Sequence, residues 1–278
     1  MTISAQYRLQ LPLKIKDEDA SVRPINKKPE SNPDSKTDQK QADKLTTLSL
    51  AEKISELQNI LYAQKQHKLL IVLQGMDTSG KDGTVRGVFG QINPLGARTV
   101  AFKAPSTVEK EHDYLWRVHQ EVPGKGEIVI FNRSHYEDVL ITRVHDWIDQ
   151  KECERRYKQI RDFESMLAET GTIILKFFLH ISKAEQKQRL EERLADPDKH
   201  WKFDPQDLAE REHWDRYQEV YADALTASDA NHAPWYIIPA NSKTQRNLTI
   251  AQIVHEKLSS LKLTYPPGKP EYSKIKVI

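Results

Sequence analysis

One segment limits the possible folds of this chain more than any other. Gly75–Gly83 reads GMDTSGKDG and follows directly on the apolar run Leu69–Leu73. Only 10 of the 278 residues are glycine, and six of them lie between Gly75 and Gly96. The spacing G-x-x-x-x-G-K between a strand and a helix lets backbone N–H groups and the helix N-terminus face an anion. The segment therefore predicts a phosphate-binding loop, rather than a glycine turn without a ligand, with these candidate residues: Gly75, Ser79, Gly80, Lys81, Asp82, Gly83 and Thr84.

The loop departs from the common pattern at two positions. Asp82 follows Lys81, where many nucleotide-binding proteins have a magnesium-binding Ser or Thr, and Thr84 stands two residues later. Asp77 lies in the middle of the loop, where its carboxylate would repel a phosphate by about 4 kcal/mol at about 4 Å and an effective dielectric constant of about 20. A divalent cation between the carboxylate and the phosphate removes this repulsion. We therefore predict that Asp77 is a Mg²⁺ ligand, and the alternative is a cap for N–H groups of the loop.

A second group of polar residues follows the apolar run Glu127–Phe131. Asn132 stands where an Asp is usual, and a neutral amide does not hold Mg²⁺ as a carboxylate does. Arg133 comes next, with a guanidinium suited to bidentate phosphate binding, and Glu137 lies about one helical turn further on. We expect all three side chains at the loop, although surface ion pairs are the alternative for Arg133 and Glu137.

Apolar runs alternate with helical patterns from Thr46 onward, which is typical of a parallel sheet with helices on both faces. We predict a three-layer α/β/α fold with a five-stranded parallel sheet. The expected strands are Leu69–Leu73, Thr99–Phe102, Glu127–Phe131, Ile173–Ile181 and Trp235–Ile238. Beyond a first helix with Leu48, Ile54, Leu57 and Leu61 on its apolar face, the expected helices are Thr84–Ile92, Val108–Val122, Tyr136–Trp147, Glu152–Glu169, Lys183–Leu194, Pro205–Ala227 and Lys243–Leu261.

The charged segment Arg189–Arg216 resembles the mobile lid that covers the phosphates in nucleotide kinases, with the lid itself at about residues 190–216. Arg193, Lys199 and Lys202 are its candidate phosphate ligands, and a solvated helix face is the alternative. Trp201 and Phe203 are expected to anchor the lid or to stack on a base. Lys103 and Arg117 are further candidates for a basic lining: Lys103 for phosphate and Arg117 for a nucleotide.

The remaining features concern the whole chain. Residues 1–45 are expected to form a flexible arm, in which Tyr7–Ile15 has the alternation of an edge strand or extended strap, and residues 266–278 to form a loose tail. Lys plus Arg is 42 and Asp plus Glu is 40, which argues against a nucleic-acid-binding protein. One cysteine, no apolar run of membrane-spanning length and no signal-peptide pattern lead us to expect a cytoplasmic protein without a membrane partner.

Several longer segments together resemble the polyphosphate kinase 2 family over about residues 45–263. They read GMDTSGKDGTV, FKAPS, HDYLWR, GEIVIFNRSHYEDVL, ILKFFLHISKAEQKQR, KHWKF and APWYIIPA. The segment FNRSHYED is similar to the class that phosphorylates both AMP and ADP, whereas the classes limited to one step carry FDRSWYN. The resemblance implies a thymidylate-kinase-like P-loop fold over residues 46–265, Mg²⁺ with Mn²⁺ as a substitute, a polyphosphate chain along basic residues, and a homo-oligomer, a tetramer or a dimer.

The resemblance also implies roles for individual residues. Asp77 is the metal-binding acid, Lys81 the phosphate-binding lysine, Arg133 the phosphate-contacting arginine and Arg193 the lid arginine. Glu137 replaces the Asn of the other classes, which implies a preference for the monophosphate acceptor. Asn132 replaces their Asp, so the role of that Asp is not transferred.

These observations lead to the hypothesis of a Mg²⁺-dependent in-line transfer of the terminal phosphoryl group of polyphosphate to AMP and ADP, with adenine and also guanine nucleotides as acceptors. Two alternatives stay open at this point. One is an ATP-dependent nucleotide or small-molecule kinase with the same fold. The other is a regulator that binds polyphosphate or a nucleotide without turnover.

Overall fold

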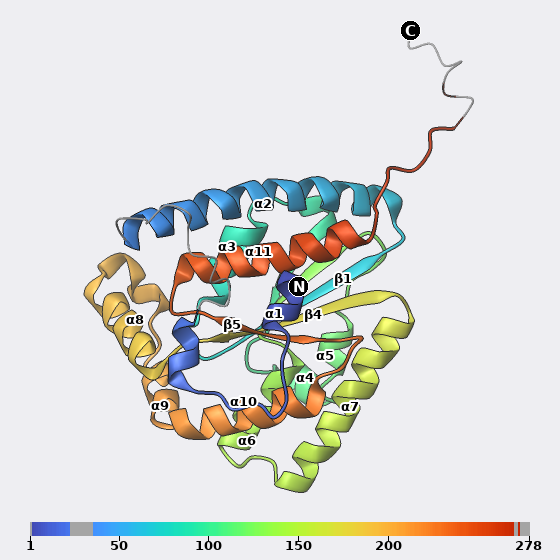
Figure 1. Cartoon of the computed structure of the whole chain (residues 1–278). Coiled ribbons are helices and arrows are strands. Elements are labelled where there is room, and N and C mark those ends of the chain that lie inside the picture. The colour runs from blue at the N-terminus through green and yellow to red at the C-terminus, as the bar shows by residue number, and fades with distance from the viewer. Residues whose placement is uncertain (1, 23–35, 270–271, 273–278) are drawn as a thin grey trace.

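Five parallel strands form the central sheet of the computed structural model (Figure 1). The structure describes residues 2–22, 36–269 and 272. The strands are Lys68–Gln74 (β1), Ala97–Ala101 (β2), Ile128–Asn132 (β3), Thr172–His180 (β4) and Trp235–Pro239 (β5). Their order in the sheet is β2-β3-β1-β4-β5, and every neighbouring pair is parallel. All five predicted strands are therefore confirmed, with ends that shift by one or two residues.

The position of β1 in the sheet determines where a ligand can bind. Leu70 of β1 pairs with Val129 of β3 on one side and with Ile174 of β4 on the other. After β1 the chain forms β2 and β3 on one side of this strand, and it later forms β4 and β5 on the other side. The loop after β1 thus lies at the point where the strand order reverses, which is where open parallel sheets bind ligands.

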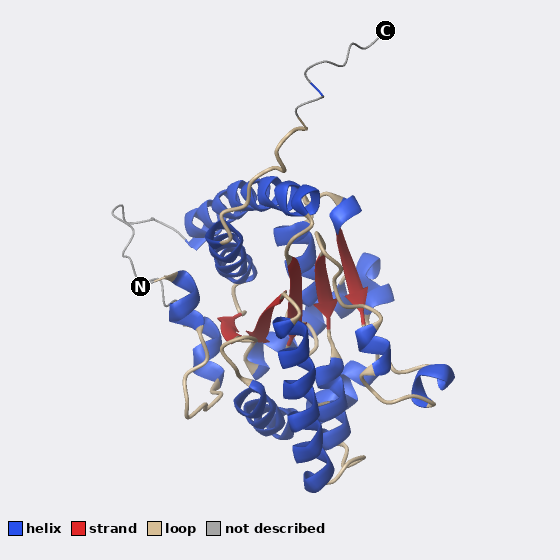
Figure 2. Cartoon of the chain, turned by 90° about the vertical axis from the view of Figure 1, so that its right-hand side faces the viewer, coloured by secondary structure: helices blue, strands red, loops and turns tan. Residues whose placement is uncertain are grey.

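Helices cover both faces of the sheet, so the predicted three-layer α/β/α architecture is confirmed (Figure 2). Three helices pack together on one face: Lys36–Gln64 (α2), Lys81–Phe89 (α3) and Lys243–Ser260 (α11). The other face carries Ile141–Val144 (α6), Gln150–Glu169 (α7) and Trp214–Ser228 (α10). The remaining helices are Ile3–Tyr7 (α1), Thr107–Lys110 (α4), Trp116–His119 (α5), Lys183–Ala195 (α8), Gln206–Glu212 (α9) and the 3₁₀ turns Asp17–Ser21 (η1), Pro94–Gly96 (η2), His135–Val139 (η3) and Pro197–Lys202 (η4).

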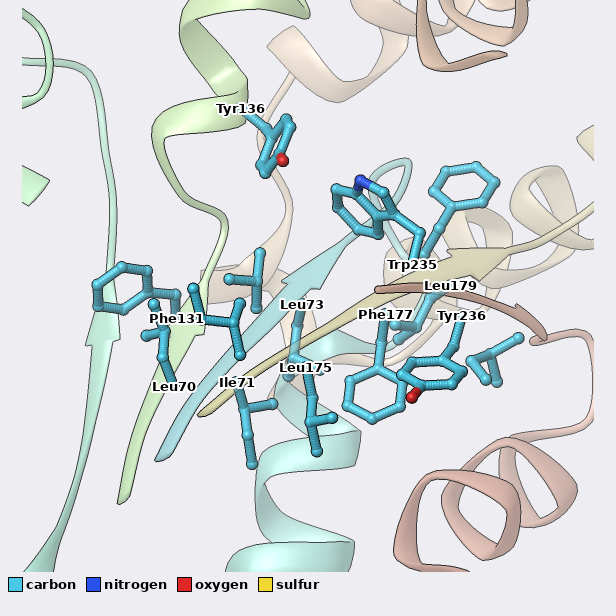
Figure 3. Packing of buried hydrophobic residues seen from close by; sticks show 14 of the residues in the cluster. Leu70, Ile71, Leu73, Phe131, Tyr136, Leu175, Phe177, Leu179, Trp235 and Tyr236 are labelled. Carbon is cyan, nitrogen blue, oxygen red and sulfur yellow. The ribbon is translucent and has the colours of Figure 1, made fainter. Parts of the chain in front are cut away.

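Large side chains from the strands fill the space between the sheet and the helices (Figure 3). The rings of Phe102 and Phe131 meet edge to face at 4.9 Å between centroids, and those of Tyr136 and Trp235 do the same at 4.9 Å. Phe177 stacks on Tyr236 at 5.4 Å. The β1 residues from Leu69 to Gln74 are all buried, which is why this run has no polar alternation.

Three predicted helices are interrupted in the structure. The expected helix Val108–Val122 consists of α4 and α5, because the Asp113 side chain accepts a hydrogen bond from the Leu115 N–H at 2.9 Å and turns the chain. The expected helix Tyr136–Trp147 consists of η3 and α6, which meet at the non-helical Leu140. Pro205–Ala227 is divided at His213 into α9 and α10.

The expectation of a flexible arm over residues 1–45 is wrong for the described part of that segment. Tyr7, Leu9 and Ala20 are buried, and Leu9 donates its N–H to the Trp235 carbonyl of β5 at 2.9 Å. Tyr7–Ile15 is therefore the strap that its alternation suggested. Further along, α2 begins at Lys36 instead of Thr46, and Asp43 accepts a hydrogen bond from the Thr244 hydroxyl of α11 at 3.1 Å. Low apolar content over the whole segment concealed these few anchoring residues.

The structure describes only part of the two outer segments. Residues 23–35 of the expected arm and residues 270–271 and 273–278 of the expected tail lie outside the described residues. Residues 263–269 have no regular secondary structure. Within the described ranges, no helix combines the length and the apolar character needed to span a membrane.

Candidate active site

The phosphate loop connects β1 to α3, and glycine is required at two of its positions. Gly80 has φ of 100°, and a Cβ atom there would lie 1.8 Å from Nη1 of Arg246. Gly75 has φ of 148°, and a Cβ atom there would lie 2.5 Å from the carbonyl oxygen of Leu179. Residues with a side chain rarely adopt such φ values, and neighbouring atoms already occupy the space of a Cβ atom at both positions. The spacing of these glycines in the sequence therefore reflects close packing around the loop.

Lys81 lies at the start of α3 and reaches back over the loop. Its Nζ donates to the Gly75 carbonyl at 2.7 Å and to the Met76 carbonyl at 3.3 Å, and the side chain is buried. Burial and the charge of Arg133 lower the pKa of Lys81, while Asp77 and Glu137 act against this. The ammonium group is thus held at the loop by two of its backbone carbonyls.

Asp77 and Arg133 form the central ion pair of the site. Nη2 of Arg133 donates to Oδ1 of Asp77 at 2.6 Å. Burial raises the pKa of Asp77, but the charges of Lys81 and Arg133 outweigh it, so the pKa lies below its ordinary value. Arg133 has φ of 63°, an uncommon conformation for a residue with a side chain, and such strain often occurs at functional sites.

A large cavity opens on the outer side of this pair, with a volume of about 600 Å³. Among the described residues that line it, ten are Lys or Arg and five are Asp or Glu. In the whole chain, by contrast, 42 basic residues stand against 40 acidic ones. The basic residues are Lys81, Arg86, Lys103, Arg133, Arg189, Arg193, Lys199, Lys202, Lys243 and Arg246, and the acidic ones are Asp77, Asp82, Glu192, Asp204 and Asp207.

A smaller cavity of about 140 Å³ lies on the other side of Asp77 and Arg133. Glu137, Asp207 and Glu210 contribute to its wall, together with Tyr217 and Tyr221 of α10. Burial raises the pKa of Glu137, although Arg133 and Lys81 act in the opposite direction. The predicted neighbours Asp77, Arg133 and Glu137 therefore meet, and Arg133 borders both cavities.

The segment from α8 to α9 covers the larger cavity, as expected for the lid. Nη1 of Arg193 lies 3.2 Å from Oδ2 of Asp207, so an ion pair at the cavity wall joins α8 to α9. Nζ of Lys202 lies 3.8 Å from Oδ2 of Asp82, and Asn132 donates to Oδ1 of the same carboxylate at 2.8 Å. Trp201 is 79% exposed at the mouth of the cavity. The side chains of the lid thus reach the loop directly.

Comparison with known proteins agrees with this geometry. The family model described as Polyphosphate kinase 2 (PPK2) matches residues 36–265. The chain belongs to the polyphosphate kinase 2 family. The resemblance predicted from its motifs is therefore confirmed.

Two curated relatives of the polyphosphate kinase 2 family and one solved structure illustrate the likeness. The chain is 53% identical to an AMP/ADP-polyphosphate phosphotransferase of Meiothermus ruber over 229 residues, which cover 82% of this chain and 85% of the relative. It is 43% identical to an ADP-polyphosphate phosphotransferase of Rhodopseudomonas palustris, over 79% of this chain and 80% of the relative. The crystal structure of polyphosphate kinase 2 from Arthrobacter aurescens TC1 superposes with a TM-score of 0.87 at 40% identity, covering 96% of this chain and 93% of that one.

Three predicted residues lie apart from the two cavities of this family member. Thr84 is buried, and its hydroxyl donates to Oδ1 of Asn247 in α11 at 3.4 Å. Ser79 is buried as well, and its hydroxyl has no hydrogen-bond partner among the described residues. Arg117 is buried beside Phe102, where Nη1 donates to the Lys103 carbonyl at 2.8 Å. Arg117 therefore supports the end of β2, and its expected nucleotide contact stays a prediction.

Two buried arginines of the site were not predicted. Nη1 of Arg189 donates to the Thr78 carbonyl at 2.8 Å, and Nη1 of Arg246 donates to the Ser79 carbonyl at 3.1 Å. Arg189 precedes the predicted Arg193 by four residues, which is the spacing of one helix face. Arg246 follows the carboxyl end of β5, and the carboxyl ends of parallel strands meet at the ligand site. Both signals were present in the sequence.

The two arginines differ in how their charge is balanced. Nε of Arg189 lies 2.7 Å from a carboxylate oxygen of Glu185. Arg246 has no carboxylate partner among the described residues, and burial together with the charge of Arg189 lowers its pKa to about 9. A buried cation without a counter-charge is costly. Arg246 borders the larger cavity, where an anionic ligand would supply the missing charge.

Proposed function

We propose that the protein transfers the terminal phosphoryl group of inorganic polyphosphate to AMP and to ADP, forming ADP and ATP. The observation that carries this proposal is the cavity at the phosphate loop, which is lined by ten basic and five acidic described residues. Among the apolar residues of its described lining, Phe102 is only 8% exposed and offers little surface to a purine base, and Trp201 lies at the mouth of the cavity. A long inorganic polyanion suits this lining better than ATP as the donor.

The residues of the loop also support a divalent cation in the reaction. Asp77 is ionised at neutral pH, because its pKa lies below the ordinary value. The described residues contain no group of three or more His, Cys, Asp or Glu side chains that could hold a metal alone. Mg²⁺ is commonly held by one or two carboxylates, substrate phosphates and water, so Asp77 fits this role. We propose Mg²⁺, with Mn²⁺ as a substitute; when bound, it offsets the negative charge of the phosphates.

The chain itself supplies most of the groups that the transfer needs. The attacking phosphate oxygen of the acceptor is already an anion, so no general base is required. Lys81 and Arg133 are positioned to stabilise the negative charge on the phosphoryl group during in-line transfer. Arg193 of the lid adds a third cation at the wall of the same cavity. Arg133 borders both cavities, which suits a residue that contacts donor and acceptor.

The test is to incubate the protein with AMP, polyphosphate and Mg²⁺ in the absence of ATP, and to separate ADP and ATP by chromatography. We expect both products. Lys81→Ala should lower the rate by about 10²- to 10³-fold, as for other groups that stabilise transition-state charge. Lys187→Ala is the matched control, because Lys187 lies on the lid helix α8 but is exposed and pairs with Glu191.

Two results would contradict the proposal. Product formation that depends on added ATP would indicate an ATP-dependent kinase. Binding of polyphosphate without turnover would indicate a regulator. The same assay with GMP and GDP tests the expected use of guanine nucleotides.

A further inference from the structure

The N-terminal strap, which we define as residues 2–22, is part of the folded core although it precedes the family match at residues 36–265. It runs beside β5, where Leu9 donates its N–H to the Trp235 carbonyl at 2.9 Å and Arg8 pairs with Asp229. Figure 1 shows the strap passing in front of β5 at the edge of the sheet, with η1 beside the region where α8 begins. The strap thus connects the edge strand β5 with the lid helix.

The far end of the strap holds the start of α8. Oδ2 of Asp17 accepts a hydrogen bond from the Lys183 N–H at 3.1 Å, at the first residue of the helix. Nε2 of His180, two residues before the N-cap Ser182, donates to the Lys16 carbonyl at 2.7 Å. Since the first N–H groups of a helix have no partner within the helix, Asp17 supplies one of the missing acceptors.

The same end of the strap also holds Asn241, which follows β5. The N–H of Asn241 donates to the Ala20 carbonyl at 3.2 Å, and its Nδ2 donates to Oγ of Ser21 at 2.8 Å. Ala20 is fully buried at this contact. The carbonyl of Asn241 in turn accepts from Nη2 of Arg189 at 2.9 Å. Asn241 therefore links the strap to Arg189 through hydrogen bonds to both.

Side chains from α8 hold the outer face of the phosphate loop. Arg189 donates to the Thr78 carbonyl at 2.8 Å, and Nε2 of Gln186 donates to the Asp77 carbonyl at 3.1 Å. Thr78 has φ of 64°, which is unfavourable for a residue with a Cβ atom. The N–H groups of such a loop face a phosphate only while its carbonyls face outward, and Arg189 and Gln186 bind those carbonyls.

We infer that the strap positions the phosphate loop through α8 and Asn241. Asp17 and Ser21 hold the start of α8 and Asn241 in place. α8 and Asn241 in turn position the side chain of Arg189. Arg189 then holds the carbonyls of the phosphate loop. Asp17 and Ser21 are thus positioning residues, since neither of them lines the two cavities. Loss of their contacts should weaken phosphate binding by making the loop less ordered before binding.

The test compares two variants that loosen different ends of the strap, and it rests on the proposed function for its choice of ligand. Asp17→Ala/Ser21→Ala removes the side-chain hydrogen bonds with the start of α8 and with Asn241. Arg8→Ala removes the ion pair with Asp229 beside β5 and serves as the control. For each protein, thermal denaturation gives the Tm, and calorimetry with sodium tripolyphosphate and Mg²⁺ gives the Kd without any turnover.

We expect Asp17→Ala/Ser21→Ala to raise the Kd for tripolyphosphate about tenfold, which is about 1.4 kcal/mol. Arg8→Ala should change this Kd by less than about twofold at a similar loss of Tm. Asp17→Asn/Ser21→Thr, which keeps both oxygen acceptors, should restore binding. In kinetic measurements, Asp17→Ala/Ser21→Ala should raise the KM for polyphosphate and change the KM for AMP little.

The inference is overturned if Asp17→Ala/Ser21→Ala binds tripolyphosphate as tightly as the unmodified protein. It is also overturned if both loosened variants lose affinity in proportion to their loss of Tm, because the strap would then act through stability alone. Failure of the unmodified protein to bind tripolyphosphate would overturn the proposed function, and this inference with it.

Discussion

At the scale of single residues, Arg246 is a buried cation without a carboxylate partner among the described residues. Its pKa is lowered to about 9 by burial and by Arg189. We expect Arg246→Met to raise the Kd for tripolyphosphate about 10- to 100-fold, because a hydrogen bond to a charged group contributes about 1.5–3 kcal/mol. Thermal stability should be retained or should increase, since the variant removes a buried charge. Calorimetry and thermal denaturation measure the two effects.

The matched control for Arg246 is Arg216→Met, since Arg216 lies near the protein surface and pairs with Glu219 at 3.2 Å. It should leave the Kd unchanged. An Arg246→Met protein that binds as tightly as the unmodified one would show that the cavity does not use this charge.

Asp207 makes stability depend on pH. Burial and the carboxylate of Asp77 raise its pKa to about 6, above the ordinary value of 3.8. The folded protein therefore binds this proton more tightly than the unfolded chain. The resulting stability is complete below pH 3.8 and is lost as the pH rises through about 6. Asp207→Asn resembles the protonated form, so its Tm should rise relative to the unmodified protein between about pH 4.5 and 7.5.

Asp215→Asn, at an exposed position of α10, is the control for this titration. The assignment to Asp207 fails if the Tm profiles of Asp207→Asn and the unmodified protein run parallel over that pH range.

At the scale of elements, the phosphate loop depends on a glycine that two separate effects require. Gly80 combines φ of 100° with a Cβ position 1.8 Å from Arg246. Gly171, between α7 and β4, has a similar φ of 92°, but no described heavy atom lies within 4 Å of its Cβ position. Both Gly80→Ala and Gly171→Ala should cost about 1–2 kcal/mol of stability through the backbone. Only Gly80→Ala should also lower kcat/KM, by at least about 100-fold, because it displaces Arg246 and the loop.

Urea denaturation and steady-state kinetics on the two alanine variants separate these effects. Full activity in Gly80→Ala would show that the loop tolerates a change in its backbone. A comparable loss of activity in Gly171→Ala would show that lower stability alone accounts for the effect.

The elements that could be predicted from the sequence are those whose characteristic residues lie close together along the chain. The loop was recognised because its glycines, Lys81 and the flanking strand and helix lie within about twenty residues. Asp77 and Arg133 could be placed together because each follows a buried strand. The breaks at Asp113 and Leu140 were missed, because a side-chain hydrogen bond or one unusual backbone angle ends a helix without changing its apolar pattern.

The features of the site that the sequence did not predict depend on tertiary contacts. In the sequence, Arg189 is one charge in a charged segment, whereas its burial depends on the carbonyls of Thr78 and Asn241. The hydrogen bond from Arg117 to the Lys103 carbonyl was not predicted either, and the expected nucleotide contact of Arg117 stays a prediction. The composition of residues 1–45 predicted no order, yet Tyr7 and Ala20 are buried by β5, α11 and Asn241.

At the scale of the whole molecule, charge is distributed unevenly although it is nearly balanced in total. The chain has 42 basic and 40 acidic residues, and the larger cavity has ten basic and five acidic described residues. The excess of positive charge is therefore concentrated where a polyanion would bind, and net charge alone did not reveal it. The homo-oligomer implied by the family resemblance stays a prediction, which light scattering of the purified protein would test.

A buried ion pair joins the layers of the molecule. Nζ of Lys176 in β4 lies 2.6 Å from Oε2 of Glu164 in α7, 2.8 Å from the Tyr136 hydroxyl and 2.9 Å from the Ser228 carbonyl. Both charged side chains are almost fully buried. Lys176→Met should lower the free energy of unfolding by about 3–5 kcal/mol, because it leaves Glu164 buried without its cation. Urea denaturation at neutral pH measures this loss.

Two further variants separate the charge of this pair from its packing. Lys176→Met/Glu164→Leu should recover part of the stability, since an apolar pair avoids the cost of one unpaired charge. Lys158→Met, which breaks the exposed pair with Asp162 on the outer side of α7, should cost at most about 1 kcal/mol. If Lys176→Met is no more destabilising than Lys158→Met, the ion pair does not hold α7 against the sheet, and apolar contacts such as Phe163 and Leu167 must do so.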